Sequence, residues 1–414
     1  MKIKIFLIFI FILGIFLRLY PAIVHPLWLD EVYSLYFASN FSYLKIIFRL
    51  PDCHPGLFYF FLKFLLHFST STIILRTIVG IIPQIIGCLV IQSRFKKPLL
   101  TTAFLLNPLF IHLAWQIRMY SLVFLITVLV ISLILKPNFS IKKLVVLIFL
   151  GNLISYSFII PSFSLILYLA FFKNRKIIFI SLLVILEFFI FKGPQYKTLA
   201  ETASWISIPS FNNIGSVILT SLGFASDIFS LSRLSIFSSI IFYLVSGYLF
   251  YKISKKYSLF LFNVTLPLIV TIILSVFIPF LSQRYFFYLF TPKVSLFIPR
   301  FLLPMSVFFY IYIFNYFQHH HKLIIGVLIL FWIPTFYSIN FKLPYLNTDV
   351  INTKNSNIIF LPPSENLRLN SKFTIDDLNN ISRIYNSAEI MEKQLLQKPP
   401  ICTLYSQYFK VNYI

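Results

Sequence analysis

Long apolar runs alternate with short basic clusters along most of the chain. Membrane proteins keep Lys and Arg preferentially in their cytoplasmic loops, so we assign the basic clusters to the cytoplasm. With that assignment the pattern predicts about eleven membrane-spanning helices, a cytoplasmic N-terminus and an external C-terminus. The expected spans lie at about 4–22, 72–92, 99–115, 119–135, 143–160, 161–172, 177–192, 235–251, 258–281, 295–317 and 323–340.

The first of these runs resembles a signal sequence, but no small-x-small cleavage site follows it, so we expect it to remain as a span. Residues 23–70 then form an elaborate external loop. Within it, Leu57–Phe68 is apolar but short and carries a Lys and a His. A run of about 10–14 residues more often lies at the membrane interface than across it. We therefore expect an interfacial helix there, with an amphipathic partner around Asp30–Phe48, and a second external loop at 193–234.

Residues 341–414 differ in kind from the rest of the chain. They are polar and contain no span. Their pattern predicts two short strands, Asn357–Leu361 and Ile401–Leu404, and a helix that begins near Thr374. The sequence therefore predicts a membrane domain at 1–340 and a small external α+β appendage at 341–414.

Composition supports the membrane class. Hydrophobic residues make up 59% of the chain and charged residues 11%, with a mean hydropathy of +0.88, which exceeds what a soluble domain can bury. The net charge of +23 does not indicate a nucleic-acid partner, because much of the Lys and Arg lies in short clusters between apolar runs. The three cysteines show no disulfide or metal-ligand spacing. The sequence has neither a Walker loop nor a dinucleotide fingerprint, which argues against an ATP-driven pump.

Acidic residues are scarce, since 12 Asp and Glu stand against 35 Lys and Arg. Two of them, Asp30 and Glu31, are adjacent and follow the first span by a few residues. A carboxylate at a membrane boundary is costly to desolvate, which favours a functional role. An isolated pair of this kind is more often a solvated turn, but further polar residues at the outer boundary favour the functional interpretation.

These further candidates are all expected at the outer face or in the outer half of a span. They are Asp52 and His54 before the interfacial helix, Arg76 in the second span, Gln116, Arg118 and Tyr120 between the third and fourth spans, Trp205 in the second external loop, and Arg300 in the tenth span. A His near a helix N-terminus is a reasonable anion site, and an arginine inside a span is rare and expensive. Trp205 and Arg118 are equally typical of an interfacial aromatic belt with a snorkelling cation.

A series of short motifs runs from Arg18 to Pro304. They are Arg18-Leu19-Tyr20, Trp28-Leu29-Asp30-Glu31, Asp52-Cys53-His54-Pro55, Leu75-Arg76, Asn107-Pro108, Arg118-Met119-Tyr120, Trp205 with Pro209-Ser210, and Arg300-Phe301-Leu302-Leu303-Pro304. In this order they resemble the GT-C superfamily of polyprenyl-phosphate-sugar-dependent glycosyltransferases. The resemblance is greatest to the family 39-like branch of protein mannosyltransferases and aminoarabinose transferases.

The resemblance implies a GT-C fold and a multi-pass enzyme of the cell membrane. The enzyme would move a sugar from a polyprenyl-phosphate donor, among membrane lipids, to a hydroxyl or amine of a protein, lipid or glycan at the external face. Asp30 would be the general base, with inversion at the sugar carbon, and Glu31 would orient the acceptor or the base. The donor phosphate and the substrates would be bound by Asp52, His54, Arg76, Gln116, Arg118, Tyr120, Trp205 and Arg300. No cofactor is required, and a divalent metal ion has no supporting ligand set.

The chain departs from the family pattern at three places. Gly56 stands where the second proline of His-Pro-Pro is usual, and Gln116 stands where many members have a carboxylate. Ser155-Tyr156-Ser157-Phe158 replaces a His or Tyr near the end of the fifth span, and only Tyr156 is carried over from there. The missing carboxylate at Gln116 weakens any expectation of a metal site.

Two other functions remain as alternatives. A transporter or flippase of lipid-linked sugars would share the hydropathy and the basic residues, but it should carry its polar side chains near the middle of the membrane. A catalytically inactive GT-C scaffold would keep the fold without needing Asp30. The intact Trp28–Glu31 motif and the clustering at the outer boundary favour the enzyme.

Overall fold

The computed structural model describes a helical protein. It covers residues 2–25, 27, 29–50, 54–136, 138–172, 179–192, 217–218, 221–223, 247–248, 251–273, 302–317, 325–326, 328–329 and 332–333. Within these ranges nearly all residues are helical and none lies in a β-strand. The all-α part of the prediction is therefore confirmed there. The α+β appendage expected at 341–414 and most of the loop at 193–234 lie outside the described residues.

The chain forms α1 (Lys2–Val24), α2 (Leu29–Asn40), α3 (Tyr43–Arg49), α4 (Leu57–Leu66), α5 (Thr72–Arg76), a π-helical stretch (Thr77–Ile81), α6 (Ile82–Phe95), α7 (Pro98–Leu106), α8 (Pro108–Ala114) and α9 (Tyr120–Ile134). It continues with α10 (Ile141–Ile154), a 3₁₀ turn (Tyr156–Phe158), α11 (Ile159–Phe172), α12 (Phe179–Lys192), α16 (Ser258–Phe260), a second π-helical stretch (Leu261–Thr265) and α18 (Leu303–Tyr316). Helices thus begin and end within a few residues of most of the expected spans that the structure describes.

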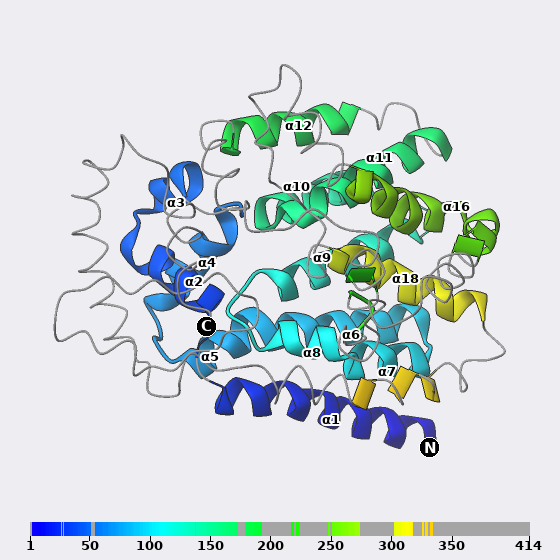
Figure 1. Ribbon diagram of the computed structural model, residues 1–414, viewed down its shortest axis with the longest axis horizontal. Helices are drawn as coiled ribbons and strands as arrows, with labels where there is room; N and C mark the ends of the chain where they lie inside the picture. Colours follow the sequence, from blue (N-terminus) through cyan, green and yellow to red (C-terminus); the bar gives the residue numbers. More distant parts are fainter. Residues whose placement is uncertain are drawn as a thin grey trace, which may run out of the picture.

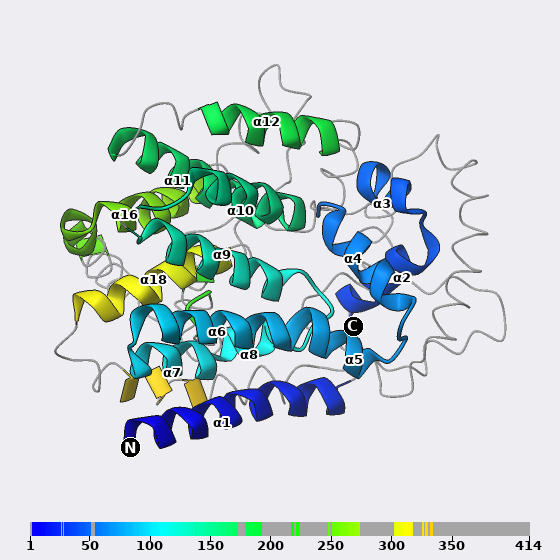
Figure 2. The same ribbon diagram turned by 180° about the vertical axis from the view of Figure 1, so that it is seen from behind.

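The longer helices lie side by side, and three short ones cover one end of them (Figures 1 and 2). Helix α9 is central and packs against α6, α10 and α18. Helices α2, α3 and α4 gather at the end where α1 finishes and α5 begins. Two basic side chains make hydrogen bonds at the opposite end. Arg94 Nη2 donates to the carbonyl of Leu135 at 2.8 Å, and Lys97 Nζ donates to Asn315 Oδ1 at 2.5 Å. The short helices and these basic turns therefore lie at opposite ends of the molecule.

The outward faces of several helices are apolar. The exposed large side chains of α12 are Phe179, Leu182, Leu183, Leu186 and Ile190, and those of α1 are likewise aliphatic or aromatic. Soluble monomers rarely expose continuous apolar stripes of this kind. Among the described residues, Ile5–Val24 and Thr72–Phe95 are long and apolar enough to cross a membrane, by length and composition alone.

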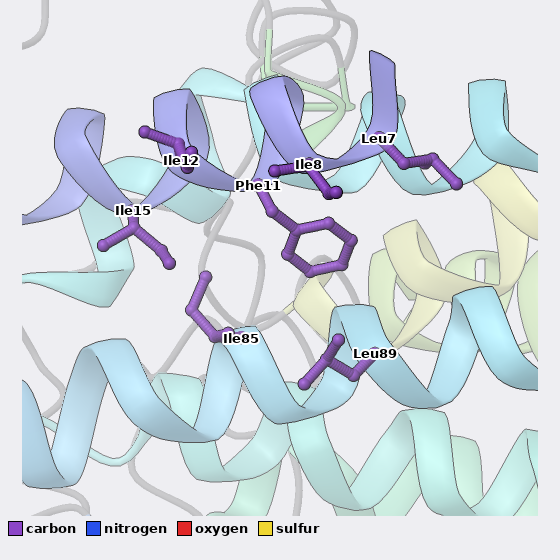
Figure 3. Close-up of a pocket in the computed structure, with 7 residues that line it drawn as sticks. All are labelled: Leu7, Ile8, Phe11, Ile12, Ile15, Ile85 and Leu89. Atoms are coloured by element: carbon purple, nitrogen blue, oxygen red, sulfur yellow. The ribbon is translucent and has the colours of Figure 1, made fainter. Parts of the chain in front are cut away.

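An apolar groove separates the first half of α1 from α6 (Figure 3). It is lined by Leu7, Ile8, Phe11, Ile12, Ile15, Ile85 and Leu89. All seven side chains are hydrocarbon, so the groove offers water no hydrogen-bond partner from its walls.

One expected span consists of two helices. The sequence predicts a single helix at 99–115, but α7 ends before Asn107 and α8 begins after it. Pro108 has no amide hydrogen to continue α7, and Asn107 Oδ1 accepts from the amide of Leu109 at 2.9 Å, which caps α8. Apolar composition on both sides of the break hides it from a hydropathy pattern.

Arg18 of α1 compensates for the end of α7. Its guanidinium donates to the carbonyls of Leu105 at 2.7 Å and Phe104 at 3.2 Å, in the last turn of α7. Arg18 Nε also donates to Gln84 Oε1 at 3.1 Å. This fully buried arginine therefore satisfies carbonyls that a helix end leaves without intrahelical partners.

The segment expected to form the first external loop contains three short helices. Where one amphipathic helix is expected at Asp30–Phe48, α2 ends and α3 restarts after Ser42, whose hydroxyl accepts from the amide of Lys45 at 3.3 Å. Lys63 of α4 donates to the carbonyl of Ala38 at 3.1 Å, which ties α4 to the end of α2. The capping of α3 and the contact with α4 explain why the segment folds as two helices.

Helix α4 lies where the interfacial helix is expected, and its start is packed tightly on α3. A Cβ atom at Gly56 would lie 2.3 Å from the carbonyl oxygen of Ile46, closer than any real contact. A proline at this position would not fit the arrangement. A glycine at position 56 thus has a steric reason in this chain.

Candidate functional site

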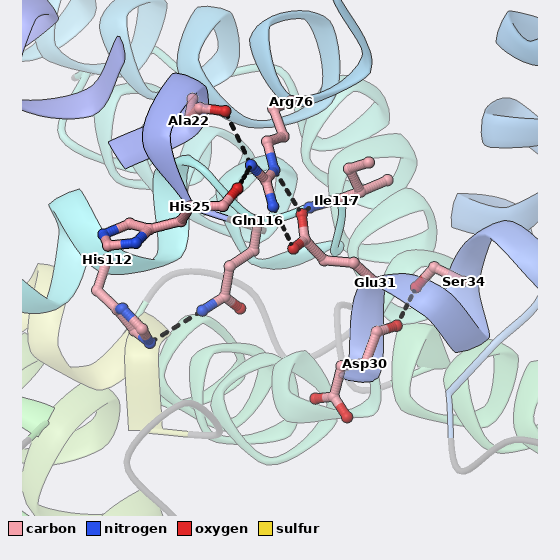
Figure 4. Close-up of polar contacts among 9 residues, drawn as sticks. All are labelled: Ala22, His25, Asp30, Glu31, Ser34, Arg76, His112, Gln116 and Ile117. Carbon is pink, nitrogen blue, oxygen red and sulfur yellow. Dashed lines mark hydrogen bonds and ion pairs between the residues drawn. The ribbon is translucent and has the colours of Figure 1, made fainter. Parts of the chain in front are cut away.

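Glu31 and Arg76 form a fully buried ion pair beside the start of α2. Arg76 Nε donates to Glu31 Oε1 at 2.9 Å, and Arg76 Nη2 donates to Glu31 Oε2 at 2.7 Å (Figure 4). Both side chains are at most 2% exposed. Two parallel hydrogen bonds of this kind give the strongest form of an arginine–carboxylate contact. The pair is therefore an internal element of the structure.

The same pair joins segments that are distant in the sequence. Arg76 Nη1 donates to the carbonyls of Ala22 at 2.8 Å and His25 at 2.7 Å, at the C-terminal end of α1. Glu31 Oε1 also accepts from the amide of Ile117 at 2.8 Å, in the turn before α9. Figure 4 shows these contacts converging on one guanidinium and one carboxylate. The pair fixes the start of α2 relative to α1 and to that turn.

The turn before α9 also packs tightly against Arg76 and Gly80. The Trp115 ring lies beside the Arg76 guanidinium, with 5.3 Å between Arg76 Cζ and the ring centroid. A Cβ atom at Gly80 would lie 1.9 Å from the carbonyl oxygen of Ala114. Any side chain at position 80 would therefore displace the turn, which carries two of the candidate residues.

Asp30 is placed differently from its neighbour. It lies in the first turn of α2, its side chain is 23% exposed, and its carboxylate points away from the Glu31–Arg76 pair (Figure 4). Arg118 Nη2 lies 3.8 Å from Asp30 Oδ2. A helix start favours negative charge, as does a nearby guanidinium. Of the two adjacent acids, Asp30 is the one that a substrate can reach.

Arg118 is oriented by groups from α2 and α4. Its Nη1 donates to Ser34 Oγ at 3.0 Å, to Tyr59 Oη at 3.1 Å and to the carbonyl of Asp30 at 3.3 Å. The side chain is only 5% exposed. These contacts fix the guanidinium between α2 and α4, with Nη2 directed toward the Asp30 carboxylate.

His54 and Tyr120 meet where the chain enters α4. The His54 ring is 1% exposed and lies edge-on to the Tyr120 ring, with 6.5 Å between the centroids. Tyr120 is fully buried at the start of α9. The two rings help to pack the start of α4 onto α9. The anion-binding role expected for His54 stays a prediction.

Gln116 lies beside His112. The Gln116 and His112 Nε2 atoms are 2.9 Å apart, and Gln116 is 2% exposed. Gln116, where the resemblance would lead us to expect a carboxylate, thus pairs with a histidine. Within the ranges that the structure describes, no group of three or more His, Cys, Asp or Glu side chains comes together as a metal site would require.

Three of the predicted residues, Asp52, Trp205 and Arg300, lie outside the described residues. The structure also brings in three that the sequence analysis did not single out, Ser34, Tyr59 and His112. Ser34 could have been found from helical spacing, because it lies one turn after Asp30. Tyr59 comes from another helix, and no local pattern indicates its contact with Arg118.

The site combines one reachable carboxylate with one oriented guanidinium. A carboxylate can accept a proton from a hydroxyl or amine, and a guanidinium can orient that carboxylate or bind an anionic group. This chemistry suits a transfer reaction in which the acceptor loses a proton. No protein-family model matches the chain, and neither a curated protein nor a solved structure is significantly similar to it.

Proposed function

We propose that the chain is an integral membrane glycosyltransferase that takes a sugar from a polyprenyl-phosphate donor. The order of motifs from Arg18 to Pro304 supports this assignment. The observation that carries it is the unequal placement of the acid pair. Glu31 is buried and bound to an arginine, whereas Asp30 is partly exposed beside Arg118. An adjacent pair in a solvated turn would have both carboxylates in water.

In this proposal the chain crosses the cell membrane several times, with its N-terminus in the cytoplasm and its C-terminus outside. The apolar outward faces of α1 and α12 support contact with lipid. The basic turns with Arg94 and Lys97 would face the cytoplasm. Asp30, at the opposite end, would then face outside, with α2, α3 and α4 on the outer membrane surface.

Asp30 acts as the general base. The acceptor oxygen or nitrogen attacks the anomeric carbon of the donor sugar, and its proton passes to the Asp30 carboxylate. The bond between that carbon and the phosphate oxygen breaks, and its electron pair leaves with the lipid phosphate. The acceptor is a hydroxyl or amine of a protein, lipid or glycan. The leaving lipid phosphate makes a nucleotide cofactor unnecessary.

Inversion at the sugar carbon assigns a role to Arg118. Attack and departure occur on opposite faces of the sugar, so the base and the leaving phosphate are separated by the sugar ring. Arg118 lies 3.8 Å from the base, which suits a group that orients the Asp30 carboxylate. Binding of the leaving phosphate then falls to cations on the other side of the sugar, among which the sequence favours Arg300.

The substitution Asp30→Asn tests this proposal. It keeps the shape of the side chain but removes its ability to accept a proton, so turnover should fall by about 10²–10⁴-fold. Donor affinity should persist, because the loss lies in the transition state. The assay is transfer of labelled sugar from membrane lipid to endogenous acceptors. Asn40→Ala, at the far end of α2, is the matched control, because among the described residues the Asn40 side chain bonds only to the carbonyl of Tyr36.

The assay separates the alternatives. Full transfer by Asp30→Asn would remove Asp30 as the base and, with it, the placement of the active site. A transporter would move lipid-linked sugar across the membrane and form no glycosylated product, even in the wild type. An inactive scaffold would do neither.

A further inference from the structure

A small cavity with three polar residues in a mainly apolar wall lies between α10, α11 and α12. Its wall includes Pro55, Asn152, Tyr156, Val184 and Glu187, and it has room for about one group the size of a water molecule. The cavity lies at the same end of the helices as the candidate site. Pro55 in its wall is four residues before Tyr59, whose hydroxyl accepts a hydrogen bond from Arg118. The cavity is nevertheless separate from the contacts around Asp30.

Glu187 is the unexpected member of this cavity. It stands alone in the apolar sequence of α12 and is 5% exposed. Among the described residues neither of its carboxylate oxygens makes a hydrogen bond of good geometry, and the Asn152 side chain is the polar group beside it. A buried acceptor without a partner is destabilising, and a buried carboxylate more so. A chain with few acidic residues thus keeps one where it lowers stability, which points to a ligand.

Asn152 of α10 supplies a complementary group to the same cavity. Its Oδ1 accepts from Ser162 Oγ at 3.3 Å, which orients the amide. Its Nδ2 has no hydrogen-bond partner in the part of the chain that the structure describes. The wall therefore presents carboxylate acceptors from one helix beside an amide donor from another, without a well-formed hydrogen bond between them.

A hydroxyl group matches this set of donors and acceptors. It donates one hydrogen bond, which Glu187 can accept, and it accepts one, which Asn152 Nδ2 can donate. An ammonium group has three donors and no acceptor, so it would leave Asn152 unmatched. A phosphate is too large for the cavity.

We propose that Glu187 and Asn152 bind one hydroxyl of the sugar carried by the donor lipid. The inference rests on the proposed function and names the group through which the saccharide is recognised. A buried site built to hydrogen-bond a hydroxyl rejects an analogue that lacks it by a factor on the order of 10⁴ or more. Glu187 and Asn152 therefore contribute to the choice of sugar, while Asp30 performs the proton transfer.

Thermal unfolding of the purified full-length protein tests this inference without any transfer reaction. The probes are a short-chain polyprenyl phosphate and the same lipid phosphate carrying one of a panel of hexoses and pentoses. Stabilisation by the bare lipid phosphate reports on the donor lipid alone. The additional stabilisation by a sugar-bearing lipid reports on the saccharide. We expect at least one sugar to add a clear increment in the wild type.

Glu187→Met removes the carboxylate at similar volume. The sugar increment should then fall by at least tenfold in affinity, while binding of the bare lipid phosphate stays unchanged. The empty variant should unfold at a higher temperature than the wild type, because an unpaired buried group is gone. Leu186→Met, on the lipid-facing side of the same helix, is the control and should keep both affinities. Glu187→Gln replaces one acceptor oxygen by a donor and provides a second variant should Glu187→Met fail to fold.

The outcomes distinguish this inference from the proposed function. If Glu187→Met and Glu187→Gln retain the full sugar increment, the cavity holds water only and the inference is overturned. If the wild type binds bare and sugar-bearing lipids equally, the saccharide subsite is absent although donor-lipid recognition survives. If no polyprenyl phosphate stabilises the wild type, the proposed function fails and the inference fails with it.

Discussion

Breaking the Glu31–Arg76 pair tests whether two adjacent acids have separate tasks. Glu31→Met leaves the Arg76 guanidinium buried without its carboxylate. Arg76→Met likewise leaves the Glu31 carboxylate buried without its guanidinium. Removing one partner of a buried ion pair costs about 3–5 kcal/mol, because the remaining charge is no longer compensated. We expect each single substitution to destabilise the protein by this amount.

Glu31→Gln should cost less than Glu31→Met. Its amide oxygen can still accept from the amide of Ile117, a contact of 2.8 Å in the wild type, whereas methionine leaves that donor buried and unsatisfied. The double substitution of Glu31 and Arg76 by Met should cost less than the sum of the two single changes, since no charge is then left without a partner. This non-additivity is the signature of the pair itself.

The assay combines thermal unfolding of the purified protein with transfer of labelled sugar. A loss of 3–5 kcal/mol lowers the unfolding temperature by roughly 3–6 °C, taking an unfolding entropy of about 2.1 cal/mol/K per residue. Asp30→Asn is the adjacent control and should unfold with the wild type while losing turnover. If Glu31→Met unfolded at the wild-type temperature and lost acceptor binding, Glu31 would belong to the substrate site, and our structural assignment would be wrong.

Two further predictions concern the packing around the site, and a third concerns the orientation of the chain in the membrane. Gly80→Ala should lower both the unfolding temperature and the transfer rate, because its Cβ would collide with a backbone oxygen. Gly247→Ala, whose Cβ would have no atom of the described residues within 4 Å, should change neither in the same measurements. Tyr59→Phe removes a 3.1 Å hydrogen bond to the site's guanidinium and should reduce turnover more than stability, as parallel kinetics and unfolding would show. A reporter fused after Lys97 should be cytoplasmic and one after Phe68 external, and the reverse result would contradict the proposed orientation.

The helices could be predicted from the sequence because long apolar runs bounded by polar or basic residues indicate where helices begin and end. The pattern therefore located most of the described helices, including α4. It did not locate the interruption at Asn107, because the residues on both sides are equally apolar. Here the local chemistry of Asn107 and Pro108, which the pattern averages away, decides where one helix ends and the next begins.

The contacts of the site could not be predicted in the same way. The sequence identified Glu31 as a catalytic candidate and Arg76 as a donor-binding candidate, but they are 45 positions apart, and no local pattern indicates that they pair. The same is true of Tyr59 and Arg118. Glu187 did carry a signal, since a single acid in an apolar helix indicates a function by default.

The geometry of a helix explains why two adjacent acids can serve such different purposes. Successive residues point about 100° apart around the axis, given about 3.6 residues per turn. When Glu31 turns inward to Arg76, Asp30 must therefore turn toward another side of α2, where it meets Arg118. The buried acid thus sets the direction of the exposed one through a single backbone step. Moving the acid pair apart by even one residue would leave Glu31 paired with Arg76 and rotate the proposed base, Asp30, away from Arg118.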